Sequence, residues 1–403
     1  MKLVYKAFCR TVQLGFRIAL PLLPYREPQR LSAVDDVAPL LRKMEIASVL
    51  LVTDPVLKRS GATARLEAEL EKYQISCTVY DKTCPNPTVY HIEEALQQYH
   101  KGGCRGIIAF GGGASMDCAK AVGARVAYPK RSLRQMRGLL RVWRKLPPLI
   151  AIPTTAGTGS EVTVAAVITD PETHHKYTML NFTFIPAFAV HDPAVSCSLP
   201  PHVTATTGMD ALTHAVEAYI GGTTTAETRR LAREAVKLVF ENLETAYQNG
   251  SDPVARKNML QAAYSAGIAF SKSYVGYIHA VAHSLGGQYN MAYGLTNAVL
   301  LPIVLELYGD CIHEQLRDLA VEAGVAQPTD APAVAAAAFI RAIRALNHRM
   351  EIPAKLGGIR REDIPVMARC ADREANPLYP VPRLMDAKEL KIIYETVADW
   401  SQA

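Results

Sequence analysis

Several features are missing from this 403-residue sequence, and each absence excludes a class of protein. The eight cysteines are scattered between positions 9 and 370 without a Cys-x-x-Cys pair, which argues against a disulfide framework or a zinc ribbon and for a reducing cytoplasm. There is no internal repeat and no low-complexity tract. The nearest approach to a membrane span, residues 11–24, is too short and is interrupted by Arg17, so we expect no integral membrane segment.

The N-terminal segment is basic as well as apolar, because Lys2, Lys6 and Arg10 precede the run 11–24. We expect a leader helix packed on the body of the protein. The alternatives are a basic amphipathic helix lying on a surface and a signal peptide. The interrupted apolar core and the lack of a small-residue cleavage site count against the signal peptide.

The overall composition is that of a globular protein, with 49% hydrophobic and 20% charged residues and a modest net charge of +6. One stretch, 130–145, holds seven basic residues in sixteen positions. Its apolar residues Leu133, Met136, Leu140 and Trp143 recur at helical spacing, which predicts a solvated amphipathic helix. No second basic or aromatic platform accompanies it, so we expect no nucleic-acid partner.

The first half of the chain alternates between short apolar runs and helical patterns. The predicted strands are 47–53, 75–80, 106–110 and 149–152, and the predicted helices between them are 66–73, 89–99 and 114–127. Because strands that alternate with helices form parallel sheets covered on both faces, we expect a doubly wound α/β domain.

Beyond about residue 200 the alternation stops and long helical patterns follow, at 226–247, 255–269 and 333–346. The composition changes near Asp192, which is followed by Pro193. We therefore expect three parts, which are a leader at 1–45, a dinucleotide-binding domain at 46–195 and a helical metal-binding domain at 196–403.

Three glycines at 111–113 directly follow a predicted buried strand. Such a run lets the backbone turn sharply and approach a ligand, and the next helix presents free N–H groups to an anion such as pyrophosphate. The run is not Gly-x-Gly-x-x-Gly, and a tight turn without a ligand is the alternative. The loop 153–161 is similar, because its threonines, serine and glycines offer many hydrogen-bond donors.

Asp54 follows the first predicted strand, where an acid can bind a ribose diol and repel a 2′-phosphate. This favours NAD over NADP, although Asp54 can also cap the following helix. Lys176 is a candidate cationic partner for phosphate or ribose, and a solvated lysine is the alternative.

The segment 206–219 is predicted to be a helix that begins at Thr206 or Thr207. Asp210 and His214 stand four residues apart on it, so one turn places both on the same face. A carboxylate and an imidazole there suit a divalent metal, and an exposed hydrogen-bonded couple is the alternative.

A second apolar helical segment, 277–285, carries His279 and His283 with the same spacing of four residues. Two such polar pairs on apolar helices are costly to bury unless something binds them.

Four segments in this order, 111–117, 153–161, 192–193 and 208–214, resemble the iron-containing (group III) alcohol dehydrogenases, and the resemblance runs from about residue 46 to the C-terminus. It implies a Rossmann-like α/β N-terminal domain and an all-α C-terminal domain, the fold shared with dehydroquinate synthase, with the metal in the cleft between them.

The resemblance also implies roles for individual residues. The expected dinucleotide contacts are Asp54, Asn86, Gly112, Gly113, Asp117, Thr154, Thr155, Thr158 and Lys176. Asp210, His214 and His279 are expected to bind the metal, and His283 matches a histidine that lies beside the substrate.

One position departs from the family pattern, because Tyr293 stands where the family has a fourth ligand histidine. Tyr293 can bind the metal as a phenolate if the ion lowers the phenol pKa from its usual ~10. Alternatively His283 or water completes the shell, or the site has lost its metal. We favour the second account, because a catalytic metal needs only three protein ligands and an open position.

These expectations describe an NAD-dependent, metal-activated alcohol dehydrogenase that uses Fe²⁺, or Zn²⁺, on a small alcohol or aldehyde. We expect a cytoplasmic homo-oligomer, specifically a dimer. The alternatives are a non-catalytic or metal-depleted dinucleotide-binding homologue, suggested by Tyr293, and a dehydroquinate-synthase-like lyase.

Overall fold

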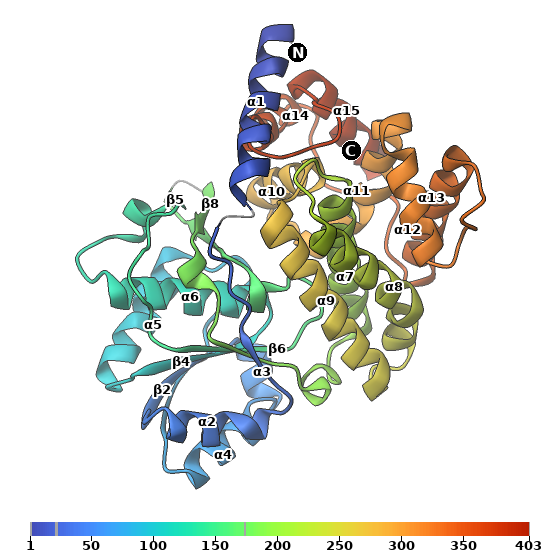
Figure 1. Ribbon diagram of the computed structural model, residues 1–403. Helices are drawn as coiled ribbons and strands as arrows, with labels where there is room; N and C mark the ends of the chain where they lie inside the picture. The colour runs from blue at the N-terminus through green and yellow to red at the C-terminus, as the bar shows by residue number, and fades with distance from the viewer. Residues whose placement is uncertain (1, 21–22, 173–174, 403) are drawn as a thin grey trace. The chain divides into compact units, whose positions relative to one another are not determined.

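The computed structural model describes residues 2–20, 23–172 and 175–402, with only the backbone described for 175–177 and 402. The chain forms two compact units, drawn in Figure 1. One unit comprises residues 24–199, and the other comprises residues 1–23 together with 200–403. The unit boundaries differ from those expected at 45 and 195, and residues 29–31, which were expected in the leader, add a strand to the sheet of the first unit.

The first unit is built on a six-stranded sheet in which every pair of neighbouring strands is parallel. In spatial order the strands are β1 (Gln29–Leu31), β9 (Phe188–Val190), β6 (Leu149–Pro153), β4 (Gly106–Gly111), β2 (Ser48–Val52) and β3 (Ser76–Tyr80). The four predicted strands and their parallel arrangement are confirmed, whereas β1 and β9 were not predicted.

Both faces of this sheet are covered by helices, as the alternating pattern predicts (Figure 1). These helices are α2 (Val37–Lys43), α3 (Pro55–Arg59), α4 (Ala64–Lys72), α5 (Val89–Lys101) and α6 (Gly113–Ala127). Successive strand residues point to opposite faces, so Leu50 and Val52 join the core beside α5 and α6, and Val49 and Leu51 join the core beside α2 and α4. Each fully buried aliphatic side chain stabilises the fold by about 2 kcal/mol.

A second, three-stranded sheet lies in the same unit and was not predicted. Its strands are β5 (Gly138–Leu139), β8 (His175–Leu180) and β7 (Ala165–Asp170), in that order. It corrects the prediction of a helix over 130–145, where only a 3-10 turn at Leu133–Met136 forms before β5. The helical spacing of the apolar residues does not produce a helix there, because Gly138 and Leu140 adopt positive φ angles of 96° and 55°.

The second unit is helical, and among its described residues no strand forms beyond one isolated bridge. Its helices are α1 (Leu3–Ala19), α7 (Pro201–Ile220), α8 (Ala226–Gln248), α9 (Pro253–Ser273), α10 (Tyr277–Tyr289), α11 (Tyr293–Tyr308), α12 (His313–Glu322), α13 (Pro332–Arg349), α14 (Ile364–Ala375) and α15 (Ala387–Val397). The expected fold class, an α/β Rossmann-like part followed by an all-α part, is confirmed.

The helix that carries Asp210 begins earlier than predicted. α7 starts at Pro201, where the fixed φ of proline suits the first helical position. Thr206 and Thr207 lie inside the helix, and their hydroxyls donate to the carbonyls of His202 and Val203 instead of capping it.

One described stretch, residues 293–322, is long and apolar enough to cross a membrane by length and composition alone. It comprises α11, a 3-10 turn and α12, and 67% of its apolar window is buried inside the protein. This burial is typical of a core helix.

Candidate active site

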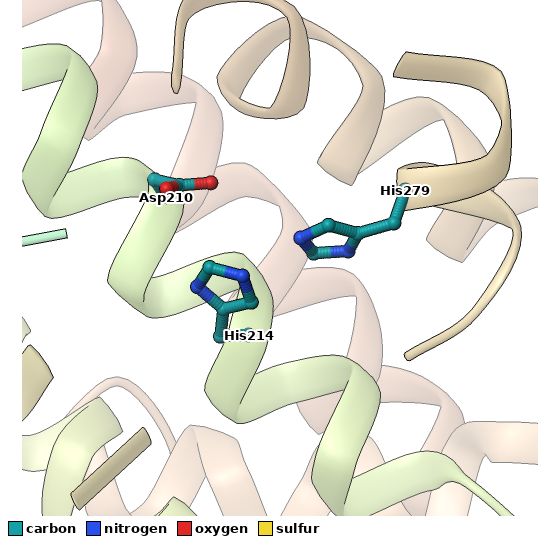
Figure 2. Close-up of side chains that lie close together, drawn as sticks. All are labelled: Asp210, His214 and His279. Atoms are coloured by element: carbon teal, nitrogen blue, oxygen red, sulfur yellow. The ribbon is translucent and has the colours of Figure 1, made fainter. Parts of the chain in front are cut away.

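Three of the predicted metal ligands converge in the helical unit. Asp210 and His214 project from α7 and His279 from α10, and one possible ligand atom from each lies within 4.8 Å of the others (Figure 2). All three residues are buried. The His214 ring stacks between those of Phe270 and His279, with centroid distances of 4.2 and 4.5 Å, so its orientation is fixed by packing.

Glu217 holds the third of these side chains in place. Its carboxylate lies 2.5 Å from Nδ1 of His279 and accepts the backbone N–H groups of Gly276 and Ile278 at 2.8 Å, which anchors the start of α10. Burial opposes protonation of His279, but the Glu217 carboxylate outweighs it and raises the pKa of the imidazole. Because Nδ1 donates to Glu217, Nε2 is the nitrogen left for a metal.

Glu217 was not predicted as a functional residue. It lies three positions after His214 on an apolar helix, so an acid on the same face as two candidate ligands was a usable signal. Asn297 was missed as well. Its amide nitrogen lies 2.7 Å from Oδ1 of Asp210 and 3.3 Å from Nε2 of His279, between two candidate ligand atoms.

The donor set fits a divalent transition metal. One carboxylate and two imidazoles are the ligands that Fe²⁺ and Zn²⁺ accept, and burial of a carboxylate with two histidines is otherwise costly. A three-residue set also leaves open positions for a substrate oxygen, as a catalytic metal requires.

His283 lies beside this group and outside it. Among the described residues, the cluster of ligand atoms comprises Asp210, His214 and His279 only. Nδ1 of His283 lies 2.5 Å from Oε1 of Glu374, which also accepts a hydrogen bond of 2.7 Å from the Tyr379 hydroxyl. The geometry therefore does not favour His283 as the residue that completes the metal shell.

Glu374 is a further residue that sequence analysis did not find. Its burial opposes ionisation, but the charge of His283 and hydrogen bonds from His283 and Tyr379 outweigh this and lower the pKa of the carboxyl group. Glu374 is separated from His283 by 91 positions, so no local spacing pointed to the pair.

Tyr293, the departure from the family pattern, is the first residue of α11. Its ring meets that of His283 edge to face, at a centroid distance of 5.4 Å. The next residue, Gly294, lies against α7, because a Cβ at that position would come within 2.5 Å of the Thr206 carbonyl oxygen. The start of α11 is thus tightly fixed against the helix that carries Asp210 and His214.

In the other unit, the two predicted phosphate loops meet. Gly112 caps α6, and a Cβ there would lie 3.2 Å from Oγ1 of Thr155. At Gly113 a Cβ would lie 2.8 Å from Cγ2 of Thr158, so a side chain does not fit. Thr154 is buried and donates its backbone N–H to the Gly111 carbonyl.

Asp117 and Lys120, both on α6, anchor the end of the second loop and the segment that follows it. Asp117 accepts hydrogen bonds of 3.2 Å from the Ser160 hydroxyl and the Val167 N–H. The buried Lys120 ammonium donates to the carbonyl oxygens of Ser160, Thr163 and Ala165 at 2.7 to 3.1 Å. Burial lowers the pKa of Lys120 to about 8, although Asp117 and Glu161 oppose the change.

Asp54 caps the helix that follows it, which was the alternative to binding a ribose. Its Oδ1 accepts the N–H groups of Val56 and Leu57, at 2.8 and 2.9 Å, and caps α3. Both bonds end on one oxygen, and no hydrogen bond from a described residue ends on Oδ2. Capping therefore does not prevent contact with a ribose.

Asn86 and Lys176 lie in neighbouring segments. Asn86 adopts a left-handed φ of 67° just before Pro87, whose carbonyl accepts the Thr169 N–H at 2.9 Å. Lys176 pairs with Thr169 across the β7–β8 ladder. The side chain of Lys176 lies outside the described part of the structure.

Two family models match the chain. Residues 29–193 match the iron-containing alcohol dehydrogenase model, and residues 204–398 match that of the C-terminal region of the same family. The chain belongs to the iron-containing alcohol dehydrogenase family. The resemblance seen in the sequence is thereby confirmed, and a dehydroquinate-synthase-like lyase is not favoured.

Individual members of this family resemble the chain over most of its length. It is 35% identical to 1,3-propanediol dehydrogenase of Citrobacter freundii, over 94% of this chain and 98% of the relative. It is 33% identical to NAD-dependent methanol dehydrogenase of Bacillus methanolicus, over 84% and 89% of the two chains. The crystal structure of a 1,3-propanediol oxidoreductase matches with a TM-score of 0.88 and 33% identity, covering 93% of this chain and 98% of that one. The protein is therefore an enzyme of the alcohol and aldehyde oxidoreductase type.

Proposed function

We propose that this family member is an NAD-dependent, metal-activated alcohol dehydrogenase that interconverts a small alcohol and its aldehyde or ketone. The observation that carries this proposal is the buried cluster of Asp210, His214 and His279, in which Glu217 fixes the free nitrogen of His279. A metal-depleted homologue would have no need of a carboxylate and two imidazoles kept buried together.

Asp210, His214 and His279 would hold the metal, for which we propose Fe²⁺, with Zn²⁺ compatible with the same donors. When bound, such an ion acts as a Lewis acid toward an alcohol or carbonyl oxygen. Glu217 keeps His279 in the tautomer that presents Nε2, and the Asn297 amide orients the Asp210 carboxylate through Oδ1.

NAD is the proposed hydride partner, as the name of the Bacillus methanolicus relative also suggests. The glycine loop at 111–113 and the hydroxyls of Thr155 and Thr158 form a close-packed surface suited to phosphate oxygens. Asp54 supplies a carboxylate that accepts from a ribose diol and disfavours a 2′-phosphate.

His283 is the proposed proton carrier. Glu374 accepts from Nδ1 of His283 and thereby leaves Nε2 to take the alcohol proton during oxidation and to return it during reduction. The Tyr379 hydroxyl donates to the same carboxylate oxygen and fixes its orientation. Glu374 acts on His283 and is a positioning residue.

We further infer a cytoplasmic homodimer. The eight cysteines are all free, which fits a reducing compartment. Light scattering of the purified protein tests the dimer.

The experiment that tests the proposed function is NADH formation from a panel of small primary alcohols and diols, measured for metal-free protein before and after loading with Fe²⁺ or Zn²⁺. We expect turnover only after loading. Tight metal binding and NAD binding without turnover of any alcohol would instead support a non-catalytic homologue.

A further inference from the structure

The N-terminal helix α1 is attached to the helical unit by one face only. Cys9 is buried on that face, and the Gln13 amide donates to the Tyr379 carbonyl at 2.6 Å. The Arg10 guanidinium donates to the carbonyls of Val381 and Pro382, both at 2.7 Å. These contacts, all from residues 9–13, hold the middle of α1 and determine which of its faces turns outward.

The outward face is apolar. Four of its large apolar residues are mostly exposed, with exposed fractions of 83% for Leu3, 53% for Phe8, 56% for Leu14 and 64% for Ile18. Residues 3, 7, 14 and 18 fall on one side of a helix with 3.6 residues per turn, and residues 4 and 8 widen the stripe. A stripe of this kind over about 25 Å of helix is unusual on a globular surface and indicates an interaction site.

The charged side chains of α1 itself are all basic. Residues 1–26 contain no aspartate or glutamate, whereas Lys6 and Arg17 lie along one edge of the stripe; Arg10, between them, is held by the carbonyls of Val381 and Pro382. Lys6 and Arg17 are exposed, and no described residue forms an ion pair with either. An acid-free cationic edge next to an apolar stripe is complementary to an anionic lipid surface, which offers phosphate groups and acyl chains together.

We propose that α1 binds the surface of a membrane that contains anionic lipid, with the apolar stripe in the headgroup region and the basic edge on lipid phosphates. A second copy of the same face fits less well, because two acid-free helices would bring only positive charges together. With 17 residues and three basic side chains, α1 is also too short and too charged to span a bilayer.

This property is separate from the proposed catalysis. The family models begin at residue 29, so α1 lies outside the matched region. The residues of the outward stripe include none of the candidate ligands of metal or dinucleotide. Membrane binding and alcohol oxidation can therefore be measured and lost independently.

The test is sedimentation of the full-length protein with vesicles of phosphatidylcholine alone and of phosphatidylcholine mixed with phosphatidylglycerol. Wild type is compared with Leu14→Glu/Ile18→Glu, which interrupts the stripe, and with Lys6→Gln/Arg17→Gln, which removes two charges and keeps the apolar face. The matched control is Val366→Glu/Ile392→Glu, because these residues are similarly exposed, at 53% and 48%, on α14 and α15.

We expect wild type and the control to bind the anionic vesicles and to bind phosphatidylcholine much less. Each α1 variant should lose at least about tenfold of its vesicle binding, and salt should weaken the binding of wild type. The proposal is overturned if wild type binds neither vesicle, or if both α1 variants bind as wild type does. If wild type does not bind vesicles and Leu14→Glu/Ile18→Glu changes the oligomeric state measured by light scattering, a second copy of the protein covers this face and the proposal is overturned.

Discussion

Oε1 of Glu374 lies 2.5 Å from Nδ1 of His283, so this carboxylate determines which imidazole nitrogen is available to exchange a proton. His279 lies on the same helix as His283, α10, and Glu217 of α7 makes the equivalent contact with it, also at 2.5 Å. The two histidines differ in their surroundings, because His279 belongs to the cluster of candidate metal ligands and His283 does not. The two acids should therefore have separable effects.

Replacing Glu374 by Gln is expected to lower kcat by about ten- to a hundredfold, since general acid–base catalysis depends on the tautomer and orientation in which Glu374 holds His283. Metal content should stay at the wild-type value. Glu374→Asp keeps the charge and should retain more activity than the glutamine variant, and Glu362→Gln, which changes an exposed acid just before α14, is the control. Loss of metal from Glu374→Gln would show that Glu374 supports the ligand cluster instead.

Glu217→Gln, by contrast, should weaken metal binding by about ten- to a hundredfold.

Asp54→Asn should relax the preference for NAD over NADP, because the amide removes the charge that repels a 2′-phosphate while it keeps the helix cap. Asp252→Asn is a matched control, since Asp252 caps α9 with the same pair of bonds, from Val254 and Ala255 at 2.9 Å. The measurement is the ratio of kcat/KM for the two cofactors. Equal use of NADP by the wild-type enzyme would refute the role given to Asp54.

Asp117 should make stability depend on pH in an unusual direction. Burial raises the pKa of its carboxyl group from 3.8 to about 6, against the opposing effects of Lys120, Val167 and Ser160. The folded state then holds the proton more tightly than the unfolded state, so the contribution of Asp117 to stability is present below about pH 4 and is lost as the pH rises to about 6. Relative to wild type, Asp117→Asn should gain stability over this range.

Urea unfolding at a series of pH values measures this difference. Asp35 provides the comparison, because its hydrogen bond with Arg65 lowers its pKa, and removing it should change the pH dependence in the opposite direction. Parallel pH profiles for wild type and Asp117→Asn would contradict the prediction.

Much of the fold could be predicted from the sequence, because strands such as β4 are buried on both faces and read as continuous apolar runs. The second sheet could not, since β5 has only two residues and lies within a stretch whose apolar residues mimic helical spacing. In the site, the spacing of four residues identified Asp210 with His214 and His279 with His283. Asn297 and Glu374 act across helices, and only tertiary packing brings them to their partners.

Tyr293→His should raise both metal occupancy and activity. A neutral phenol is a poor ligand, and its deprotonation costs free energy, whereas an imidazole at the start of α11 would restore the donor that the family pattern has there. Metal analysis after anaerobic loading, together with alcohol oxidation, measures both effects. A loss of metal or of activity in Tyr293→His would instead identify Tyr293 as an adapted ligand or pocket residue.

The central claim is that the cluster of Asp210, His214 and His279 holds a metal required for alcohol oxidation by NAD. The most direct measurement compares metal stoichiometry and NADH formation in wild type and His279→Ala, each freed of metal and then loaded with Fe²⁺ or Zn²⁺. We predict that wild type binds the ion and forms NADH only when loaded, and that His279→Ala does neither. The account is contradicted if metal-free wild type oxidises alcohols as fast as the loaded protein, or if His279→Ala retains both metal and activity.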